Sequence, residues 1–312
     1  MTFELKFLVF QSFIILPFLT GSMIRRRVGD PAALSKRILG INLAFIEPPV
    51  ILWSIWGLTI RRDLALLPAA GLSLVTAGFL LGLATLPLLG LRGPGKKTYL
   101  ISSSLANHGF TMGGFICYLF LGETGLGLAS IFLVYFIPYT FIVIFSYARS
   151  GRGALSPASL REQIVSPRNL PLLASLTALG LLAAGVPRPE LPVPLDLFIM
   201  ASILLYYLTL GLSFEIRDVR AIGSAHPLLG LIKFIMLPAA TWLVLQMLPI
   251  DREVARVIQI QSCMPAAIYS VVTSVLFELD ARLASSLFVV NTVLFLVTAL
   301  PFLFLLRATG ML

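Results

Sequence analysis

Two short polar stretches interrupt long apolar runs, and their residue types suit the binding of an anion. They supply the candidate substrate-binding residues Asn107, His108, Gly109, Gly113, Gly114, Gln261, Ser262 and Pro265. The side-chain amide of Asn107 can donate to a carboxylate and accept from a hydroxyl. Alternatively, it can form a hydrogen bond between two helices. His108 can bind a substrate or relay a proton, or it can be a packed, satisfied side chain. Gln261 and Ser262 can line the same cavity or face other helices.

Both stretches contain residues that disrupt a helix. Glycine in a helix interior costs about 1 kcal/mol relative to alanine, and the first stretch has three glycines, ending at Gly113-Gly114. Pro265 in the second stretch removes a backbone donor and frees a carbonyl of the preceding turn. We expect two broken helices that cross near the bilayer midplane and aim amides and helix N-termini at an anion. The alternative is a pair of kinked packing helices with small residues for close contact.

Two ionisable residues, Glu47 and Lys233, lie inside apolar runs and form a possible coupling or charge site. Intramembrane carboxylates are expensive, so Glu47 can carry a proton or neutralise a cation. It can also be a protonated residue hydrogen-bonded to backbone freed by Pro48 and Pro49. Lys233 is placed near the cytoplasmic end of its span, where it can snorkel to the interface or attract an anionic substrate. Asn42 and Asn291 are weaker polar candidates.

Signatures of enzymes, metal sites and cofactor sites are absent from the sequence. It has no zinc-protease, nucleophile-elbow or phosphate-loop motif, and its two cysteines, Cys117 and Cys263, lie in apolar runs. We therefore expect no catalytic residues, no metal and no cofactor, and we do not expect an enzyme. A non-transporting receptor or intramembrane enzyme is the least favoured alternative.

The composition requires lipid as a solvent. Of 312 residues, 58% are hydrophobic and 12% are charged, whereas a soluble domain has about 25% charged residues. We expect an all-α polytopic membrane protein, since runs this long satisfy their backbone in lipid only as helices. The first run ends at Arg25-Arg26-Arg27 without a cleavage site, so it is interpreted as an uncleaved span. About ten spans are predicted, near residues 6–24, 38–60, 64–90, 98–122, 126–147, 170–186, 194–214, 227–249, 255–279 and 282–306.

The positions of the basic residues predict the orientation. The formal charge is +9, and most Lys and Arg residues fall in the odd-numbered loops. Basic residues are enriched in cytoplasmic loops, so we expect both termini to be non-cytoplasmic. The charge is explained by this topology, and no nucleic-acid partner is expected. The odd-loop residues are Arg25, Arg26, Arg27, Lys36, Arg37, Arg92, Lys96, Lys97, Arg149, Arg152, Arg161, Arg168, Arg217, Arg220 and Arg282, and the even loops carry Arg61, Arg62, Arg188, Arg252 and Arg256.

A weak internal repeat divides the chain. Leu121-Gly122-Glu123 and Leu128-Ala129-Ser130 recur as Leu276-Phe277-Glu278 and Leu283-Ala284-Ser285, each 155 positions later. We predict a first five-helix repeat at 1–150, a cytoplasmic connecting loop at 151–169 and a second repeat at 170–312. An odd number of helices per half inverts the second repeat, as in many secondary transporters.

The order and spacing of several motifs resemble the auxin efflux carrier family of membrane transporters. The first three are Gly21-Ser22-Met23-Ile24-Arg25-Arg26-Arg27, Leu34-Ser35-Lys36 and Pro48-Pro49. The others are Asn107-His108-Gly109-Phe110 before Leu121-Gly122-Glu123, and Met264-Pro265-Ala266-Ala267 before Leu283-Ala284-Ser285. The short central loop is similar to that of prokaryotic-type members.

The resemblance implies two inverted five-helix repeats, a crossover of the fourth and ninth helices, and a scaffold domain of helices one, two, six and seven. It also implies an efflux carrier of small organic anions, including carboxylates, in the plasma membrane, with Asn107 and Pro265 at the crossover. The chain departs from the family at Gly114, where a proline is usual. The expected partners besides the substrate are membrane lipid and, as one possible assembly, a second copy of the chain in a homodimer. The alternative function is a sodium- or proton-coupled symporter or antiporter of bile-acid-symporter-like architecture.

Overall fold

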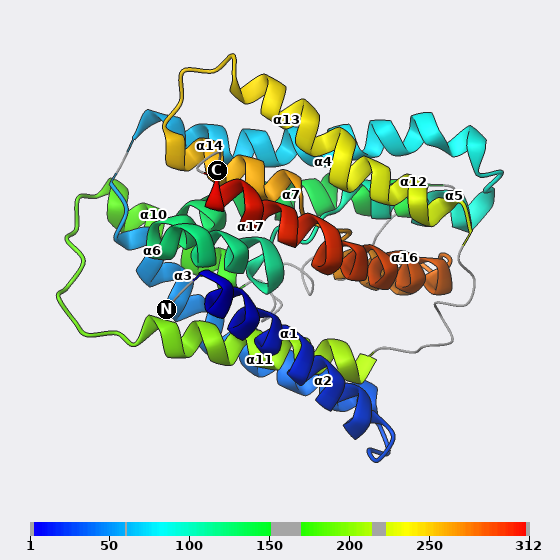
Figure 1. The fold of residues 1–312 in the computed structure, drawn as a ribbon, viewed down its shortest axis with the longest axis horizontal. Coiled ribbons are helices and arrows are strands. Elements are labelled where there is room, and N and C mark those ends of the chain that lie inside the picture. Colours follow the sequence, from blue (N-terminus) through cyan, green and yellow to red (C-terminus); the bar gives the residue numbers. More distant parts are fainter. Residues whose placement is uncertain (1–2, 60, 151–169, 214–222, 310–312) are drawn as a thin grey trace. The chain divides into compact units, whose positions relative to one another are not determined.

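The computed structural model describes residues 3–59, 61–150, 170–213 and 223–309, and all regular secondary structure within them is helical (Figure 1). The predicted connecting loop at 151–169 lies outside the described residues. So do the basic residues Arg217 and Arg220, on which part of the orientation argument rests.

Six helical stretches of the described chain are long and apolar enough to cross a membrane. They are Ala33–Trp56, Arg62–Leu88, Met112–Arg149, Leu195–Leu212, Ala225–Leu245 and Ala281–Ala308. Two shorter apolar helical stretches, Ser12–Arg25 and Leu170–Ala183, accompany them. Since spans of this length and composition favour lipid over water, the chain is a multi-pass helical membrane protein.

The helices group into two compact units. The first contains residues 1–59 with 155–215, and the second contains 60–154 with 216–312. Each unit therefore draws on both halves of the sequence. This division differs from the repeats predicted at 1–150 and 170–312, and those repeats stay a prediction.

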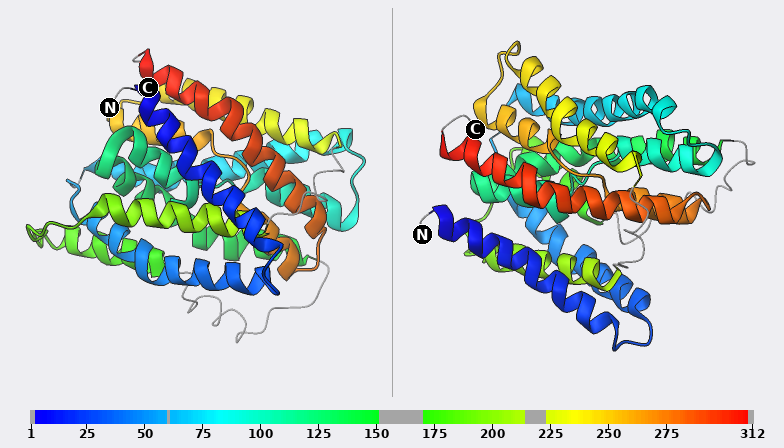
Figure 2. Two further views of the ribbon diagram at one scale, coloured as in Figure 1. Left: turned by 60° about the horizontal axis from the view of Figure 1, so that its bottom comes forward. Right: turned by 45° about the vertical axis from the view of Figure 1, so that its right-hand side comes forward.

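In the first unit, α1 and α11 lie side by side (Figures 1 and 2). Two glycines permit this approach, because a Cβ on Gly21 would overlap the carbonyl oxygen of Leu208, and one on Gly211 would overlap that of Phe18. The helices of this unit are α1 (Phe3–Arg25), α2 (Pro31–Ile41), the π-helical turn η1 (Asn42–Ile46), α3 (Glu47–Trp56), α10 (Leu170–Ala183) and α11 (Leu195–Ser213).

The second unit contains the remaining helices. In chain order they are η2 (Arg62–Ala65), α4 (Leu66–Thr85), η3 (Leu86–Leu88), α5 (Gly93–Ser104), η4 (Phe110–Gly114), α6 (Phe115–Phe132), η5 (Leu133–Tyr135), α7 (Phe136–Tyr139), η6 (Thr140–Ile144) and α8 (Phe145–Arg149). They continue with α12 (Ala225–Leu231), η9 (Ile232–Met236), α13 (Leu237–Leu245), α14 (Arg252–Ser262), α15 (Ile268–Leu276), α16 (Ala281–Leu294), η10 (Phe295–Ala299) and α17 (Leu300–Ala308).

Polar caps start several helices earlier than hydropathy alone predicts. The second span begins at Pro31 rather than near residue 38, because the Asp30 side chain accepts a hydrogen bond from the amide of Ala33 and Pro31 suits the first turn. Asp251 caps α14 in the same way. Short polar side chains at these positions satisfy amides that have no partner inside the helix.

Three π-helical turns precede prolines. Pro48, Pro238 and Pro301 each lie two residues after the last residue of η1, η9 or η10. A proline ring clashes with the carbonyl four residues before it, and a widened turn moves that carbonyl away. The amide of Glu47 accordingly bonds to Asn42 O, five residues back.

Local irregularities of the backbone recur in both halves of the chain, and one of them recurs at the spacing of 155 positions found in the sequence. The π-helical turns η6 (Thr140–Ile144) and η10 (Phe295–Ala299) lie 155 positions apart. Each Leu-x-Glu motif also contains one residue with positive φ, which is the middle residue in the first motif (Gly122, 68°) and the last residue in the second (Glu278, 48°). The backbone of the two halves therefore deviates from regular helix at corresponding places.

Candidate functional site

The second unit contains two interrupted helices. After α5 ends at Ser104, Leu105 is extended, and helical structure resumes at Phe110. The other interruption covers 263–267, between α14 and α15, and contains Pro265 as expected. The first one was predicted at Gly113-Gly114, and this is wrong. The helix ends earlier, and both glycines lie in η4, where the amides of Gly113 and Gly114 bond back to Asn107 O and Gly109 O.

The two interruptions pair with each other through their backbones. The amide of Asn107 donates to Pro265 O at 2.8 Å, and the amide of Ala267 donates to Leu105 O at 3.1 Å. An antiparallel bridge joins Ala106 and Ala266 between these bonds. Non-helical backbone at membrane depth is stable only where protein satisfies it, and each interruption supplies the partners of the other.

Asn107 lies within this pairing, with its side chain 9% exposed. Its backbone amide and carbonyl are both occupied, by Pro265 O and by the amide of Gly113. The role of its side chain in binding substrate stays a prediction.

His108 is 2% exposed, and its Nδ1 lies 2.6 Å from the hydroxyl of Tyr135. Its ring makes a T-shaped contact with that of Phe132, with the centroids 5.0 Å apart. This environment agrees with a packed, satisfied histidine. Tyr135 was missed from the sequence, because no spacing pattern pairs it with His108.

Gln261 connects the two interruptions by its side chain. Its Nε2 donates to His108 O at 3.2 Å, and the side chain is completely buried. A Cβ on Gly113 would overlap Gln261 Oε1, so glycine is needed for this contact. Ser262 instead bonds within its own helix, donating to Gln259 O at 2.7 Å.

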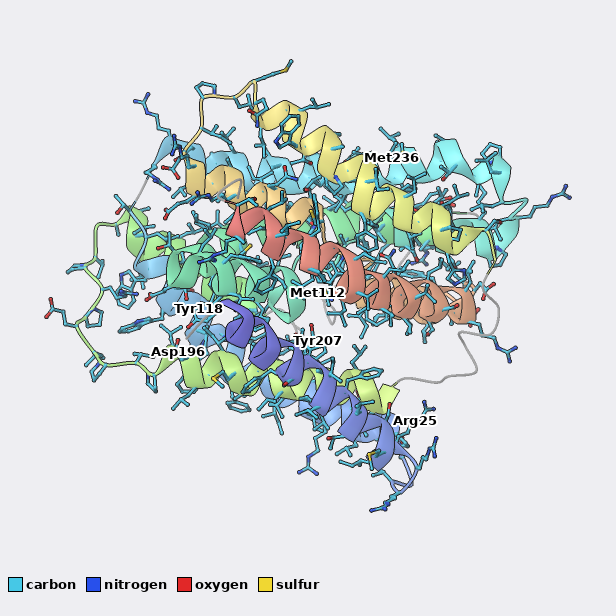
Figure 3. The ribbon with its side chains drawn as sticks, in the orientation of Figure 1. Arg25, Met112, Tyr118, Asp196, Tyr207 and Met236 are labelled. Atoms are coloured by element: carbon cyan, nitrogen blue, oxygen red, sulfur yellow. The ribbon has the colours of Figure 1, made fainter. Side chains whose placement is uncertain are left out.

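Lys233 is completely buried in η9, so of the two alternatives, snorkelling to the interface does not fit the structure, and attraction of an anionic substrate stays a prediction. Its Nζ donates to the carbonyls of Ser104 and Leu105, both at 3.2 Å. These carbonyls end α5, and the negative end of a helix dipole stabilises a cation there. The position of this π-helical turn can be found in Figure 3 by Met236, its last residue. Lys233 thus places its side-chain amine beside the first interruption.

Glu47 lies in the first unit, whereas the other candidate residues lie in the second. Its side chain is 3% exposed, accepts a hydrogen bond from Asn42 Nδ2 at 3.2 Å and is hydrogen-bonded to Tyr206. Tyr206 of α11 was not predicted. Glu47 and Lys233 therefore belong to different units, and their role as a coupling or charge site stays a prediction.

Asn291 of α16 contacts the second interruption. Its Oδ1 accepts from the amide of Ala266 at 2.8 Å, and the residue is 2% exposed. The sequence offered only a polar residue inside a span as a signal. Met112 in η4 is likewise buried, next to the first interruption (Figure 3).

This arrangement is suited to binding rather than to covalent chemistry. Around paired helix ends it offers the buried amine of Lys233, the imidazole of His108, backbone amides and the carboxamides of Asn107, Gln261 and Asn291. No group of three or more His, Cys, Asp or Glu side chains able to hold a metal ion occurs in the described part of the chain.

Proteins with many apolar spans and paired, interrupted helices of this kind are typically membrane transporters. Residues 154–303 match a family model described as "Membrane transport protein". This stretch belongs to that family, which is the auxin efflux carrier family that the motifs resemble, and the protein is a membrane transporter. No curated protein matches the chain.

Proposed function

We propose that this protein is an efflux carrier of small organic anions, in particular carboxylates. It works by alternating access about a crossover of the fourth and ninth helices, within ten helices arranged as two inverted repeats. The pairing of the two interruptions is the observation that carries the proposal. Three further arguments support the proposal separately: the lengths of the helices before the interruptions, the internal repeat, and the charges near the interruptions.

Helix lengths favour a position near the midplane. α5 has 12 residues and α14 has 11 before their interruptions. At 1.5 Å per residue these are about 18 Å and about 17 Å long. Since the hydrocarbon core is about 30 Å thick, a helix that enters from either face reaches its middle over such a length.

The recurring irregularities favour the inverted repeat. The two motifs, the two π-helical turns and the two residues with positive φ occur in the same order in both halves. Five spans per half place the second set in the opposite orientation. The first unit also combines the spans that the resemblance assigns to a scaffold, namely the first two with those near 170–213.

The charges near the interruptions favour an anion. Lys233 is buried beside the first interruption, and the partners of its Nζ are two backbone carbonyls rather than an acidic side chain. The described acidic residues of the second unit lie at helix ends or turns: Asp63, Glu123, Asp251, Glu253, Glu278 and Asp280. A buried cation without an acidic partner attracts an anionic ligand.

The cellular arrangement belongs to the same proposal. The basic odd-numbered loops face the cytoplasm, both termini are non-cytoplasmic, and the membrane is the plasma membrane. Surrounding lipid and a second copy of the chain are the proposed partners besides the substrate.

Exchange of a labelled carboxylate by reconstituted protein tests the function. Purified protein in liposomes is expected to exchange external for internal radiolabelled malate, and Asn107→Ala is expected to lower this exchange at least ten-fold. Gln246→Ala, which removes an exposed amide at the end of α13, is the control and keeps wild-type exchange. Exchange by Asn107→Ala at the wild-type rate would remove Asn107 from the site. Absence of exchange across malate, lactate, benzoate and indole acetate would overturn the anion proposal.

The second candidate is a cation-coupled symporter or antiporter. Buried Glu47, hydrogen-bonded to Asn42 and Tyr206, is the observation that favours it. Coupling predicts that a sodium or pH gradient drives uphill uptake, and that Glu47→Gln abolishes the gradient effect while leaving downhill exchange. Uptake that ignores both gradients dismisses this candidate.

A further inference from the structure

The orientation of the Asn291 side chain follows from its contact with the second interruption. The amide of Ala266 is a donor, so the atom of Asn291 that faces it must be Oδ1, and the bond is 2.8 Å long. This leaves Nδ2 directed away from Ala266. Nδ2 is buried and has no hydrogen-bond partner among the described residues.

Gln261 presents the complementary case. Its Nε2 donates to His108 O, so its Oε1 is directed elsewhere, and that oxygen is buried without a partner in the described chain. A backbone carbonyl can only accept, which again determines the amide orientation. Among the described residues, the two carboxamides that contact the interruptions thus leave one donor atom, Asn291 Nδ2, and one acceptor atom, Gln261 Oε1, without a partner.

Unused polar atoms at this depth are unfavourable unless something binds them. A buried donor or acceptor without a partner loses its hydration and regains nothing. Both side chains lie on one continuous structure, since Gln261 bonds to the first interruption, Asn291 bonds to the second, and Ala106 pairs with Ala266.

We propose that Asn291 Nδ2 donates to the substrate's carboxylate and that Gln261 Oε1 accepts from a hydroxyl or N–H group of the same substrate. The transporter therefore prefers carboxylates that also carry a hydrogen-bond donor. This inference rests on the proposed function and specifies its substrate class. It adds Asn291, from the tenth predicted span, to the binding residues.

Matched ligand pairs test the preference for a donor group. Malate differs from succinate, and lactate from propionate, by one hydroxyl. Competition against labelled malate in proteoliposomes is expected to show wild-type protein binding the hydroxylated member at least ten-fold more tightly. Gln261→Met, which lacks the acceptor, is expected to reduce this ratio to within two-fold. Gln261→Glu, which retains a carbonyl acceptor when protonated, is expected to keep it.

Asn291→Asp tests the donor without removing the contact to Ala266. The carboxyl group keeps an oxygen for that amide but, when ionised, replaces the donor by a second acceptor. Affinity for both members of each pair is expected to fall at least ten-fold at high pH and to recover as the pH falls, because a protonated carboxyl again donates. A purely structural role predicts no recovery. Asn291→Leu loses both the acceptor for the Ala266 amide and the donor proposed for the substrate. Its unfolding temperature shows how much the loss of these groups destabilises the fold, apart from any effect on binding.

The outcomes distinguish this inference from the proposed function. If wild-type protein exchanges no carboxylate, the proposed function fails and the inference with it. If it exchanges carboxylates, the inference is overturned by equal affinity within each ligand pair, or by a stable Asn291→Asp variant with wild-type affinity at every pH.

Discussion

Near the interruptions, the contacts at a position decide which side chains it can accommodate, so two residues of the same type can tolerate substitution differently. Gly113 and Gly114 are adjacent and identical, yet only Gly113 lies against a side chain that leaves no space. A Cβ there would overlap Gln261 Oε1 and lie 2.7 Å from His108 O. At Gly114 the nearest atom, Gly109 O, would be 3.5 Å away, an ordinary contact.

Gly113→Ala is therefore expected to destabilise the protein by about 1–3 kcal/mol, because the new methyl displaces the Gln261 side chain from His108. The matched control is Gly114→Ala, which is expected to be neutral or stabilising by up to about 1 kcal/mol, since alanine favours helix. Thermal unfolding in detergent measures both. Equal effects of the two substitutions would contradict the described contact.

Lys233 provides the second residue-scale prediction. Lys233→Met removes the donors to the Ser104 and Leu105 carbonyls at the end of α5. A loss of about 1.5–3 kcal/mol in unfolding free energy is expected, as for hydrogen bonds to charged groups. Lys96→Met, at an exposed position of α5, is the control and is expected to change stability by less than about 0.5 kcal/mol. An unchanged unfolding temperature for Lys233→Met would show that the carbonyls do not need the ammonium.

At the scale of elements, caps and interruptions decide where each helix begins and ends. α14 begins after a loop in which Asp251 accepts from the amides of Glu253 and Val254 at 2.8 Å and 3.4 Å. The same carboxylate receives the guanidinium of Arg61 at 2.8 Å. This cap lies at the opposite end of α14 from the paired interruptions, so it fixes the start of the helix that positions Gln261.

The charge of Asp251 gives this cap a pH dependence. Burial alone would raise the pKa of Asp251, but the two amides and Arg61 outweigh it and hold the pKa below its ordinary value. A depressed pKa means that the ionised carboxylate stabilises the fold above the unfolded pKa of about 3.9 and that this stabilisation is lost as the pH falls through the folded pKa.

Asp251→Asn, which still caps but lacks the charge, is expected to unfold at a lower temperature than wild type at pH 7. The difference should shrink as the pH falls below about 4. Asp251→Ala, which loses the cap as well, should cost about 1 kcal/mol more than Asp251→Asn at either pH. A gap between wild type and Asp251→Asn that does not change with pH would contradict the role of the charge.

For the whole molecule, the proposed topology places the loop before α5 in the cytoplasm and the C-terminus outside. Its natural cysteines allow a direct test, because Cys117 is 0% and Cys263 is 7% exposed. Both are expected to resist a membrane-impermeant maleimide, so an introduced cysteine reports its own position.

Thr309→Cys is expected to be labelled on intact cells, whereas Lys96→Cys should be labelled only after permeabilisation. The wild-type chain, labelled in parallel, gives the background. Labelling of Lys96→Cys alone on intact cells would mean the opposite orientation, and the predicted cytoplasmic position of the odd loops would then be wrong.

The sequence by itself determined the features that depend on local composition. Apolar runs were sufficient to predict membrane helices, and Pro265 was sufficient to locate the second interruption, because both effects act within a few turns of one helix. The tertiary structure alone decided which distant groups meet. It paired Asn107 with Pro265, buried Lys233 at the end of α5, aligned Gln261 with His108 O and moved the first interruption from Gly113-Gly114 to 105–109. The three contacts join residues more than 100 positions apart. The first interruption is local, but its backbone partners come from the second interruption, which is distant in the sequence. Packing between helices determines such contacts, and no spacing along one helix encodes them.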